Sequence, residues 1–431
     1  MASSPFIITE HIVDCQYIRE YPRATRLTED SLKLVVKRYT PKSNPNPRPG
    51  DITIIAGAGG GYPKELYEPI WEEIYERLKR NGLRIRSIWI ANPANQGASA
   101  ELNEESLGND PSWFDHSRDL LYMINQFKAD MPRPLMGLAH SLGAGQLMHL
   151  SLIHPRLFNS LVLVEPVFTK DFISGKGPSF LKFAISRKDV WQSQAEAAVY
   201  FKKFYKQWDP RTLSLWLQYG LKKVRSETDA AETDDPVSAV TLVTSKYQEA
   251  AQYGRPNFLN KQLLDLENNP EPDTPHDATF HPDVVGPPEE VFPFYRAEGN
   301  ILWRAVKHIR PSVLYIYGEE SPVSTAAQRA YKLQNTGAGI GGSGGYKNGR
   351  VKEVVCPHAS HELPFEDVTG VAEATAEWLK QETAKWKEEE ERIQKGWLEL
   401  TTKERTTFPE EWYTHLNSYF EKGKKNQRAK L

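Results

Sequence analysis

Short apolar runs recur along the N-terminal part of the chain, and segments with the apolar spacing of helices separate them. Apolar runs of this length are typical of buried strands. We predict strands at residues 32–39, 51–56, 85–90, 134–139 and 161–164. Because strands and helices alternate, right-handed crossovers are expected, and the fold class is α/β, with a mostly parallel sheet covered by helices on both faces.

The segments between these runs have the pattern of amphipathic helices. In the segment 66–78 an apolar residue returns at every fourth position, and Asn81-Gly82 marks the end of that helix. Two further helices are predicted at 113–127 and 142–153. Each of these helices would pack its apolar face against the sheet.

The alternation stops at about residue 169 and resumes near residue 300. Between these points, aromatic-rich helical segments such as 195–208 adjoin acidic and proline-rich stretches, and 267–290 has little to bury. We interpret this region as an inserted helical cap that contains a long surface excursion. The predicted organisation is a hydrolase core in two parts (1–168 and 301–385), a cap (169–300), and a helical extension with a targeting tail (386–431).

The sheet pattern returns after the insertion. Strands are predicted at 313–317 and 351–356, followed by a helix at 371–379 whose charged continuation is a solvated face. The glycines from Gly337 to Gly342 match a dinucleotide-binding spacing, but no strand precedes them. We therefore interpret them as a loop.

Composition excludes several classes of partner. The chain has 431 residues, with 54 Lys and Arg against 56 Asp and Glu, so no broad basic surface is expected to bind nucleic acid. Its two cysteines, Cys15 and Cys356, cannot build the disulfide framework of a secreted protein. No apolar stretch reaches the length of a membrane span.

The last three residues have the form of a peroxisomal import signal. Ala429-Lys430-Leu431 is a small residue, a basic residue and leucine, and lysines precede it. This tripeptide predicts an import receptor as a partner and the peroxisome as the location. The alternative is a basic tail that increases solubility.

The segment Ala139-His140-Ser141-Leu142-Gly143 lies between a predicted strand and a predicted helix. This is the place of a nucleophile elbow, a turn so tight that the residues two before and two after the nucleophile must be small. Ala139 and Gly143 meet that requirement. Ser141 is therefore the candidate nucleophile, and the alternative is a serine that only caps the helix.

A serine hydroxyl needs a general base, and the chain order of this fold places a histidine near the C-terminus. His361 follows the strand 351–356 and precedes the last helix of the core. His358 is the competing candidate. We favour His361.

Two backbone amides are expected to stabilise the oxyanion. The candidates are those of Leu142, next to the nucleophile, and Ala58, in the glycine-rich loop after the strand 51–56. The same loop, Gly57 to Gly61, could instead hold a dinucleotide phosphate. Asn92 argues against that, because it stands where an acidic residue would bind the ribose.

The third catalytic residue departs from the usual pattern. After the strand 313–317 an aspartate is expected, but Ser321 occupies its place. A carboxylate is still needed to orient the histidine. Glu165, at the end of a strongly apolar strand, is favoured, and Glu319 or Glu320 in the later loop is the alternative acid.

These residues resemble the α/β-hydrolase superfamily, and within it the fungal peroxisomal lipase-like hydrolases and related proteins of host-selective toxin biosynthesis. The likeness covers most of the chain outside the cap, and it rests on residues 113–119, 139–145, 164–166 and 360–361 and on the tail. It differs at Ala56, Ala139 and Ser321, where the family has His, Gly and Asp.

The resemblance implies a lipase, esterase or thioesterase that acts on a fatty or polyketide-like acyl substrate in secondary metabolism, with no cofactor and no metal. Two other classes stay open at this point. One is a catalytically silent hydrolase scaffold that serves as a binding protein in the peroxisome. The other is an oxidoreductase that binds a nucleotide at Gly57 to Gly61.

Overall fold

The computed structural model describes residues 4–170, 177–224, 238–256, 279, 282–283 and 294–428. The chain forms two compact units, residues 1–382 and 383–431. The predicted import tripeptide 429–431 and most of the predicted excursion 267–290 lie outside the described residues.

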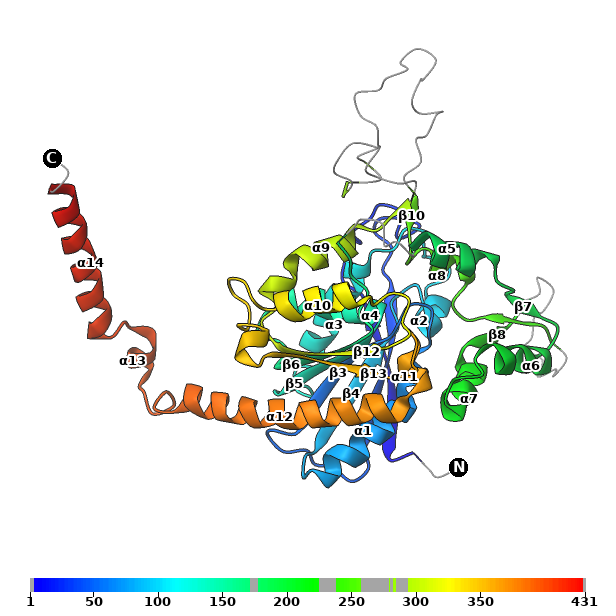
Figure 1. Ribbon diagram of the computed structural model, residues 1–431, viewed down its shortest axis with the longest axis horizontal. Coiled ribbons are helices and arrows are strands. Elements are labelled where there is room, and N and C mark those ends of the chain that lie inside the picture. Colours follow the sequence, from blue (N-terminus) through cyan, green and yellow to red (C-terminus); the bar gives the residue numbers. More distant parts are fainter. Residues whose placement is uncertain are drawn as a thin grey trace, which may run out of the picture. The chain divides into compact units, whose positions relative to one another are not determined.

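An eight-stranded sheet is the centre of the first unit (Figure 1). Its strands lie in the order β1-β2-β4-β3-β5-β6-β12-β13, with β1, β2 and β4 paired antiparallel and all other pairs parallel. The strands are β1 (Phe6–Asp14), β2 (Lys33–Pro41), β3 (Ile52–Gly57), β4 (Ile85–Ala91), β5 (Leu135–His140), β6 (Ser160–Val164), β12 (Ser312–Gly318) and β13 (Val351–Cys356). The prediction of a mostly parallel sheet is confirmed.

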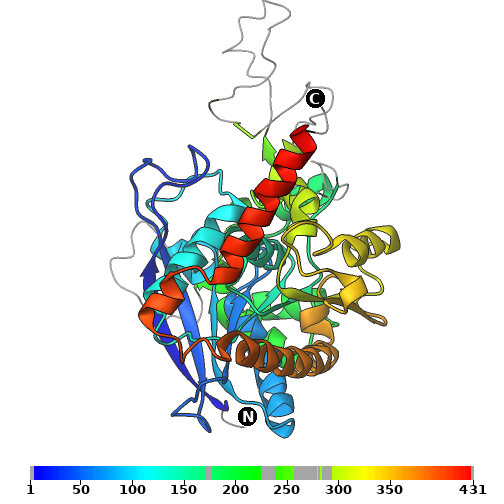
Figure 2. The same ribbon diagram turned by 90° about the vertical axis from the view of Figure 1, so that its left-hand side faces the viewer.

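Helices cover both faces of this sheet (Figures 1 and 2). One core joins the sheet to the 3-10 turn η1 (Lys64–Tyr67), α1 (Glu68–Arg80) and the first part of α12 (Val368–Gln394). The other joins it to α3 (Trp113–Gln126), α4 (Leu142–Ile153) and α9 (Ala297–Ala305). Since both faces are buried, the central strands β3, β5 and β6 are apolar throughout, which is why they could be recognised in the sequence.

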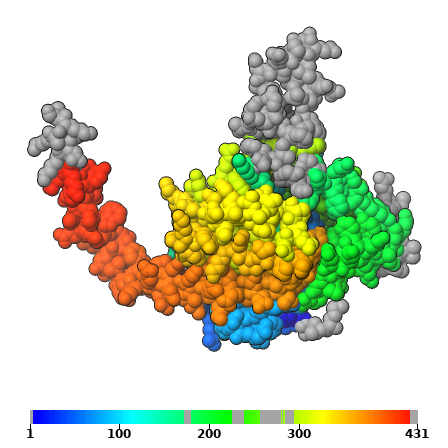
Figure 3. Space-filling model, in the orientation of Figure 1, coloured from blue at the N-terminus to red at the C-terminus, as the bar shows by residue number. Residues whose placement is uncertain are grey.

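The region predicted as a cap contains short elements beside the core, coloured green in Figure 3. Three of its strands form a small separate sheet in the order β7-β9-β8. The elements are α5 (Gly177–Ser186), β7 (Val190–Trp191), α6 (Gln194–Phe204), α7 (Pro210–Tyr219), β8 (Leu221–Lys223), β9 (Val240–Leu242), α8 (Lys246–Ala250), β10 (Arg255–Pro256) and β11 (Phe294–Tyr295).

Two helix predictions had wrong boundaries. The predicted helix 195–208 ends at Phe204, because Asp209 caps a new helix that starts at Pro210. The predicted helix 371–379 is the 27-residue α12, since residues 380–394 contain neither Gly nor Pro.

The remaining elements are α2 (Gly97–Leu102), η3 (Val306–His308), α10 (Ala326–Asn335), η4 (Tyr346–Asn348), α11 (Leu363–Glu366), α13 (Thr402–Thr406) and α14 (Glu410–Arg428). The glycine run 337–342 lies in a loop after α10, as expected. Within the described residues, no helix has the length and apolar character needed to cross a lipid bilayer.

Candidate active site

Ser141 occupies the sharp turn between β5 and α4. Its backbone has φ 52° and ψ −116°, a positive-φ conformation that residues other than glycine rarely adopt. The turn is held by a hydrogen bond that the Ser141 amide donates to the Val164 carbonyl over 2.9 Å. The strained turn projects the hydroxyl beyond the carboxyl edge of the sheet, as in a nucleophile elbow.

The small residues around this turn are required by the neighbouring strand. A Cβ added at Gly143 would lie 2.4 Å from the carbonyl carbon of Gly57, and one added at Gly57 would lie 3.0 Å from the Cβ of Ala139. The prediction of small residues therefore fits, but the crowding comes from the end of β3 as well as from the turn itself. This approach also places the Gly143 amide 3.1 Å from the Ala58 carbonyl, to which it donates.

The structure brings Ser141, His361 and Glu165 together in one row. The Ser141 Oγ lies 2.9 Å from His361 Nε2, and His361 Nδ1 lies 3.0 Å from Glu165 Oε2. A carboxylate only accepts hydrogen bonds, so Nδ1 carries the proton and Nε2 is free to accept the serine hydroxyl.

The Glu165 carboxylate is fully buried at the end of β6 and is well supplied with donors. Its Oε1 accepts from the Gly318 amide at 2.8 Å, and its Oε2 accepts from the hydroxyls of Ser321 at 2.5 Å and Ser324 at 3.1 Å. Buried carboxylates are stable only when paired in this way. Ser321, which stands where an aspartate was expected, thus binds the acid at the other position.

The alternative residues lie elsewhere. The Glu319 carboxylate accepts from the His358 amide at 3.4 Å, and Glu320 lies 3.8 Å from His358 Nδ1. All three side chains are exposed at the surface. The structure brings none of them to the ring of His361.

Of the two residues predicted to supply amides to the oxyanion, Leu142 directly follows the serine, and Ala58 contacts the same turn through its carbonyl, 3.1 Å from the Gly143 amide. Leu142 is the first residue of α4, so its amide has no acceptor within that helix, and the helix dipole adds positive charge there. Ala58 directly follows β3, in the loop whose Gly59 and Gly61 amides donate to Tyr67 Oη and Gln96 Oε1, both at 2.8 Å. Those two glycine amides are therefore committed to the protein itself.

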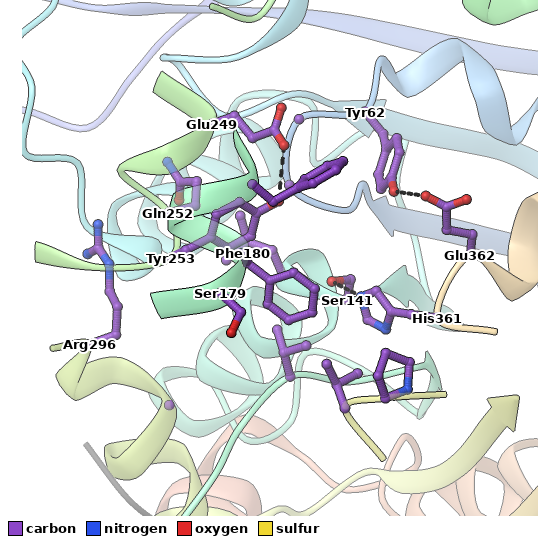
Figure 4. A pocket seen from close by; sticks show the side chains of 18 of the residues that line it. Tyr62, Ser141, Ser179, Phe180, Glu249, Gln252, Tyr253, Arg296, His361 and Glu362 are labelled. Carbon is purple, nitrogen blue, oxygen red and sulfur yellow. Dashed lines mark hydrogen bonds between the residues drawn. The ribbon is translucent and has the colours of Figure 1, made fainter. Parts of the chain in front are cut away.

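Ser141 and His361 open into a cavity of about 740 Å³ between the core and the region predicted as a cap (Figure 4). This volume is typical of a pocket for a small organic ligand. Aromatic side chains dominate the wall: Tyr62, Trp113, Phe168, Phe180, Phe183, Phe204, Tyr205, Trp216, Tyr253, Phe294 and Tyr295.

Glu249 is one of two acidic groups in the cavity wall that are paired inside the protein. It forms an ion pair with Arg187 and accepts from Tyr253 Oη at 3.3 Å. Burial raises the pKa of its carboxyl, while the arginine opposes that shift. The pair leaves this side of the wall without net charge.

Glu362 is the second such group, and no role was predicted for it from the sequence. Its carboxylate accepts from Tyr62 Oη at 2.8 Å and from Trp208 Nε1 at 2.7 Å, and burial raises its pKa. Figure 4 shows Tyr62 and Glu362 facing each other beside His361. No local pattern in the sequence could reveal this contact, because three distant segments make it.

Neither a metal site among the described residues nor a matching family model is found. In the part of the chain that the structure describes, no group of three His, Cys, Asp or Glu side chains is arranged to hold a metal ion. No family model matches the chain.

Curated relatives decide the family. A type I acyl-CoA thioesterase of Penicillium roqueforti is 37% identical over 450 residues, which covers 100% of both chains. The chain belongs to the α/β-hydrolase superfamily. A type I acyl-CoA thioesterase of Penicillium brevicompactum is 37% identical over 453 residues, again with 100% of both chains covered. This chain is therefore a hydrolase of ester or thioester bonds.

Solved structures show the same α/β-hydrolase fold. The peroxisomal α/β-hydrolase of Saccharomyces cerevisiae superposes with a TM-score of 0.64 at 16% identity, over 98% of this chain and 99% of the other. Among more distant relatives, an abhydrolase domain-containing protein of Alternaria alternata is 24% identical over 289 residues, which covers 67% of this chain and 99% of that protein.

Proposed function

We propose that this hydrolase is a serine thioesterase that cleaves acyl-CoA thioesters, with Ser141 as nucleophile, His361 as general base and acid, and Glu165 as the acid that orients the histidine. The observation that carries the proposal is the continuous row from Ser141 Oγ through both ring nitrogens of His361 to Glu165, with spacings of 2.9 and 3.0 Å. The thioesterase names of full-length relatives support the choice of bond.

In the first half-reaction, Ser141 Oγ attacks the thioester carbonyl carbon while its proton moves to His361 Nε2. The imidazolium that results is stabilised by the buried Glu165 carboxylate. When the tetrahedral intermediate collapses, the carbon–sulfur bond breaks, and His361 returns the proton to the departing thiolate. The products are a free thiol and an acyl group bound to Ser141 as an ester.

In the second half-reaction, His361 takes a proton from a water molecule, which attacks the acyl ester. Collapse of this second intermediate returns the proton to Ser141 Oγ and releases the carboxylic acid. In both steps the amides of Leu142 and Ala58 would donate to the oxyanion, in the positions described above.

The aromatic cavity is proposed to hold the acyl group, which would be fatty or polyketide-like. Apolar and aromatic walls favour such a group because its transfer from water removes apolar surface from solvent. A panel of acyl-CoA thioesters and acyl esters of graded size would test this, with thiol release as the readout. The proposal predicts activity with thioesters and a preference for bulky or long acyl groups over acetyl.

A serine-reactive fluorophosphonate probe tests the mechanism. Labelling is expected in the wild-type protein and is expected to disappear in Ser141→Ala and His361→Ala. Glu165→Gln keeps the shape of the acid but removes its charge, so turnover should fall by roughly 10²–10⁴-fold. Glu320→Gln is the matched control, because that carboxylate is exposed, and it should retain wild-type turnover. Equal activity in both Gln variants would refute the assignment of the acid.

We further propose that the protein works in the peroxisome, in secondary metabolism. The support is the tripeptide Ala429-Lys430-Leu431 and the likeness of the fold to a peroxisomal hydrolase. A fluorescent protein fused to the N-terminus should give punctate fluorescence that overlaps a peroxisomal marker. The same fusion without the last three residues should give diffuse fluorescence. An unchanged punctate pattern would refute the proposal that these residues are an import signal.

A further inference from the structure

His140, the residue before the nucleophile, is fully buried, and the mechanism above does not use it. Its imidazole is surrounded by the rings of Tyr62, Tyr67, Phe365 and His361, with centroid distances of 5.9, 6.1, 5.6 and 5.3 Å. A histidine in such an apolar setting needs partners for both ring nitrogens.

Both nitrogens have partners, and each partner belongs to a functional segment. His140 Nε2 lies 2.9 Å from the backbone carbonyl oxygen of His361, and Nδ1 lies 2.9 Å from Tyr67 Oη. The Tyr67 oxygen in turn accepts from the amide of Gly59 at 2.8 Å. The contacts thus run from the loop of the proposed oxyanion amide to the backbone of the proposed base.

For a neutral imidazole, only one arrangement of protons satisfies all three contacts. A carbonyl oxygen can only accept, so His140 Nε2 must carry the hydrogen and donate to His361. Nδ1 is then the acceptor, and the Tyr67 hydroxyl donates to it. The tyrosine oxygen is left free to accept from Gly59, so every hydrogen bond points in the same direction along the chain of contacts.

We propose that His140 is a positioning residue, which in its neutral, Nε2-protonated form fixes the loop at Gly59 and the backbone of His361 relative to each other. This inference rests on the proposed function and adds to it. The oxyanion loop follows β3 and the base follows β13, two strands that are not neighbours in the sheet. Together with the hydrogen bond from Tyr62 to Glu362, the imidazole fixes their separation, which the tetrahedral intermediate requires to be constant.

Two further observations support the proposal. A Cβ added at Gly59 would lie 2.7 Å from His140 Nδ1, so the loop approaches the ring as closely as a glycine allows. Burial, together with the nearby His361, lowers the pKa of His140 to about 3. The ring therefore stays neutral, as the direction of the hydrogen bonds requires.

Kinetics of Tyr67→Phe provide the first test. The substitution removes one hydroxyl and keeps the ring, so Gly59 and His140 each lose a partner. Because the contact would position groups for the transition state and does not touch substrate, kcat should fall about tenfold with KM little changed. Tyr75→Phe is the matched control on α1, since its hydroxyl bonds to Ser43 at 2.8 Å, away from the cavity, and it should keep wild-type kinetics.

Rescue by a conservative variant provides the second test. Glutamine at position 140 keeps an N–H near the position of Nε2, whereas leucine keeps only volume. His140→Gln is therefore expected to retain at least about tenfold more kcat than His140→Leu. Equal kcat in these two variants, or an unchanged kcat in Tyr67→Phe, would overturn the proposal.

The tautomer of His140 can be measured independently of enzymatic activity. In the full-length wild-type protein labelled with ¹⁵N in its histidine rings, His140 should show a protonated Nε2 and an unprotonated Nδ1 from pH 8 to pH 5. An Nδ1-protonated tautomer, or protonation near pH 6.5, would overturn the proposal even in an active enzyme. Lack of thioester hydrolysis by the wild type would refute the proposed function and leave the tautomer result to decide the placement of His140.

Discussion

At the scale of single residues, Ser321 supports the proposed acid, Glu165, in its unusual place at the end of β6. Its hydroxyl donates to Glu165 Oε2 at 2.5 Å, from the loop position where an aspartate was expected. An aspartate there would place a second negative charge against a buried carboxylate. An uncharged donor at position 321 is therefore compatible with Glu165, whereas an acidic residue there is not.

Ser321→Ala should weaken this arrangement. A hydrogen bond to a buried charged group contributes about 1.5–3 kcal/mol, so the free energy of unfolding should fall by an amount of that order and kcat by about tenfold. Chemical denaturation and thiol release would measure the two effects. Ser31→Ala, at an exposed position before β2, is the control and should change neither. Unchanged kcat in Ser321→Ala would show that the hydroxyl does not support the acid.

Lys332 is a second residue whose setting has a measurable consequence. Its ammonium is buried, donates to the Pro166 carbonyl at 2.8 Å and lies 4.3 Å from the centre of the Phe168 ring. Burial lowers its pKa from 10.5 to about 7, with Glu165 opposing the shift. Between these two pH values the unfolded chain binds more protons at this residue than the folded protein does.

The folded state should therefore gain stability as pH rises from 7 towards 10.5. The contribution of this one residue is about 1.4 kcal/mol per pH unit. Lys332→Met removes the titrating group and keeps its length, so the difference in unfolding free energy between wild type and variant should change with pH by about that slope. Denaturant titrations at pH 7, 8 and 9 would measure it. Parallel curves for the two proteins would contradict the assignment.

At the scale of elements, the turn between α6 and α7 connects the cap region to the loop of His361. Trp208 Nε1 donates to Glu362 at 2.7 Å, and the Asp209 amide donates to the Phe365 carbonyl at 2.7 Å. Both contacts reach residues that closely follow His361. The position of this part of the cavity wall therefore depends on the same loop that carries the proposed base.

Trp208→Phe should weaken the attachment of the turn between α6 and α7 to the loop of His361. The substitution leaves a buried carboxylate with one donor fewer, which costs about 1–3 kcal/mol of stability. Because the turn adjoins the cavity, KM for a large acyl thioester should rise several-fold, more than kcat falls. The matched control is Trp412→Phe on α14, an exposed tryptophan in the second unit, which should leave KM unchanged.

The elements that could be predicted are those with a clear period. β3, β5 and β6 are apolar along their whole length because both faces of the sheet are covered, and they were recognised as strands. β1 was missed because it is an edge strand with several apolar side chains on its exposed face, which hides the alternation. The two- and three-residue strands β7, β8 and β9 are too short to show any period.

The residues of the candidate site also fall into those that the sequence could predict and those that only the folded structure reveals. Ser141 and His361 could be named because small neighbours and chain order are local signals. The choice between Glu165 and the later acids depended on which side chain faces the imidazole, a property of the assembled sheet. Tyr67 and Glu362 were missed for the same reason, since their partners lie 73 and 300 residues away, at His140 and Tyr62.

At the scale of the whole molecule, the proposed catalytic residues and the proposed import signal belong to different units. Ser141, Glu165 and His361 all belong to the first unit, residues 1–382, while the tail belongs to the second, residues 383–431. The first unit has two extensive apolar cores of its own. Its fold should therefore not depend on the last part of the chain.

A chain that ends after Gln394 tests this separation. It should hydrolyse acyl-CoA with kcat and KM within about twofold of the full chain and unfold at a similar temperature, because the cores are intact. In cells it should no longer reach peroxisomes. The full chain with only its last three residues removed is the control, and loss of activity in the shorter chain alone would show that residues 395–431 contribute to the site.

The loop after β12 has two roles, because Ser321 and Ser324 donate to the Glu165 carboxylate while neighbouring residues of the loop line the cavity. Pro322, Val323 and Thr325 of that loop line the cavity and supply no charge to the imidazole. Substitutions at these three positions would reshape the cavity proposed to receive the acyl group while Ser321 and Ser324 keep their hydrogen bonds to Glu165. These positions are therefore the first place to engineer a new substrate range.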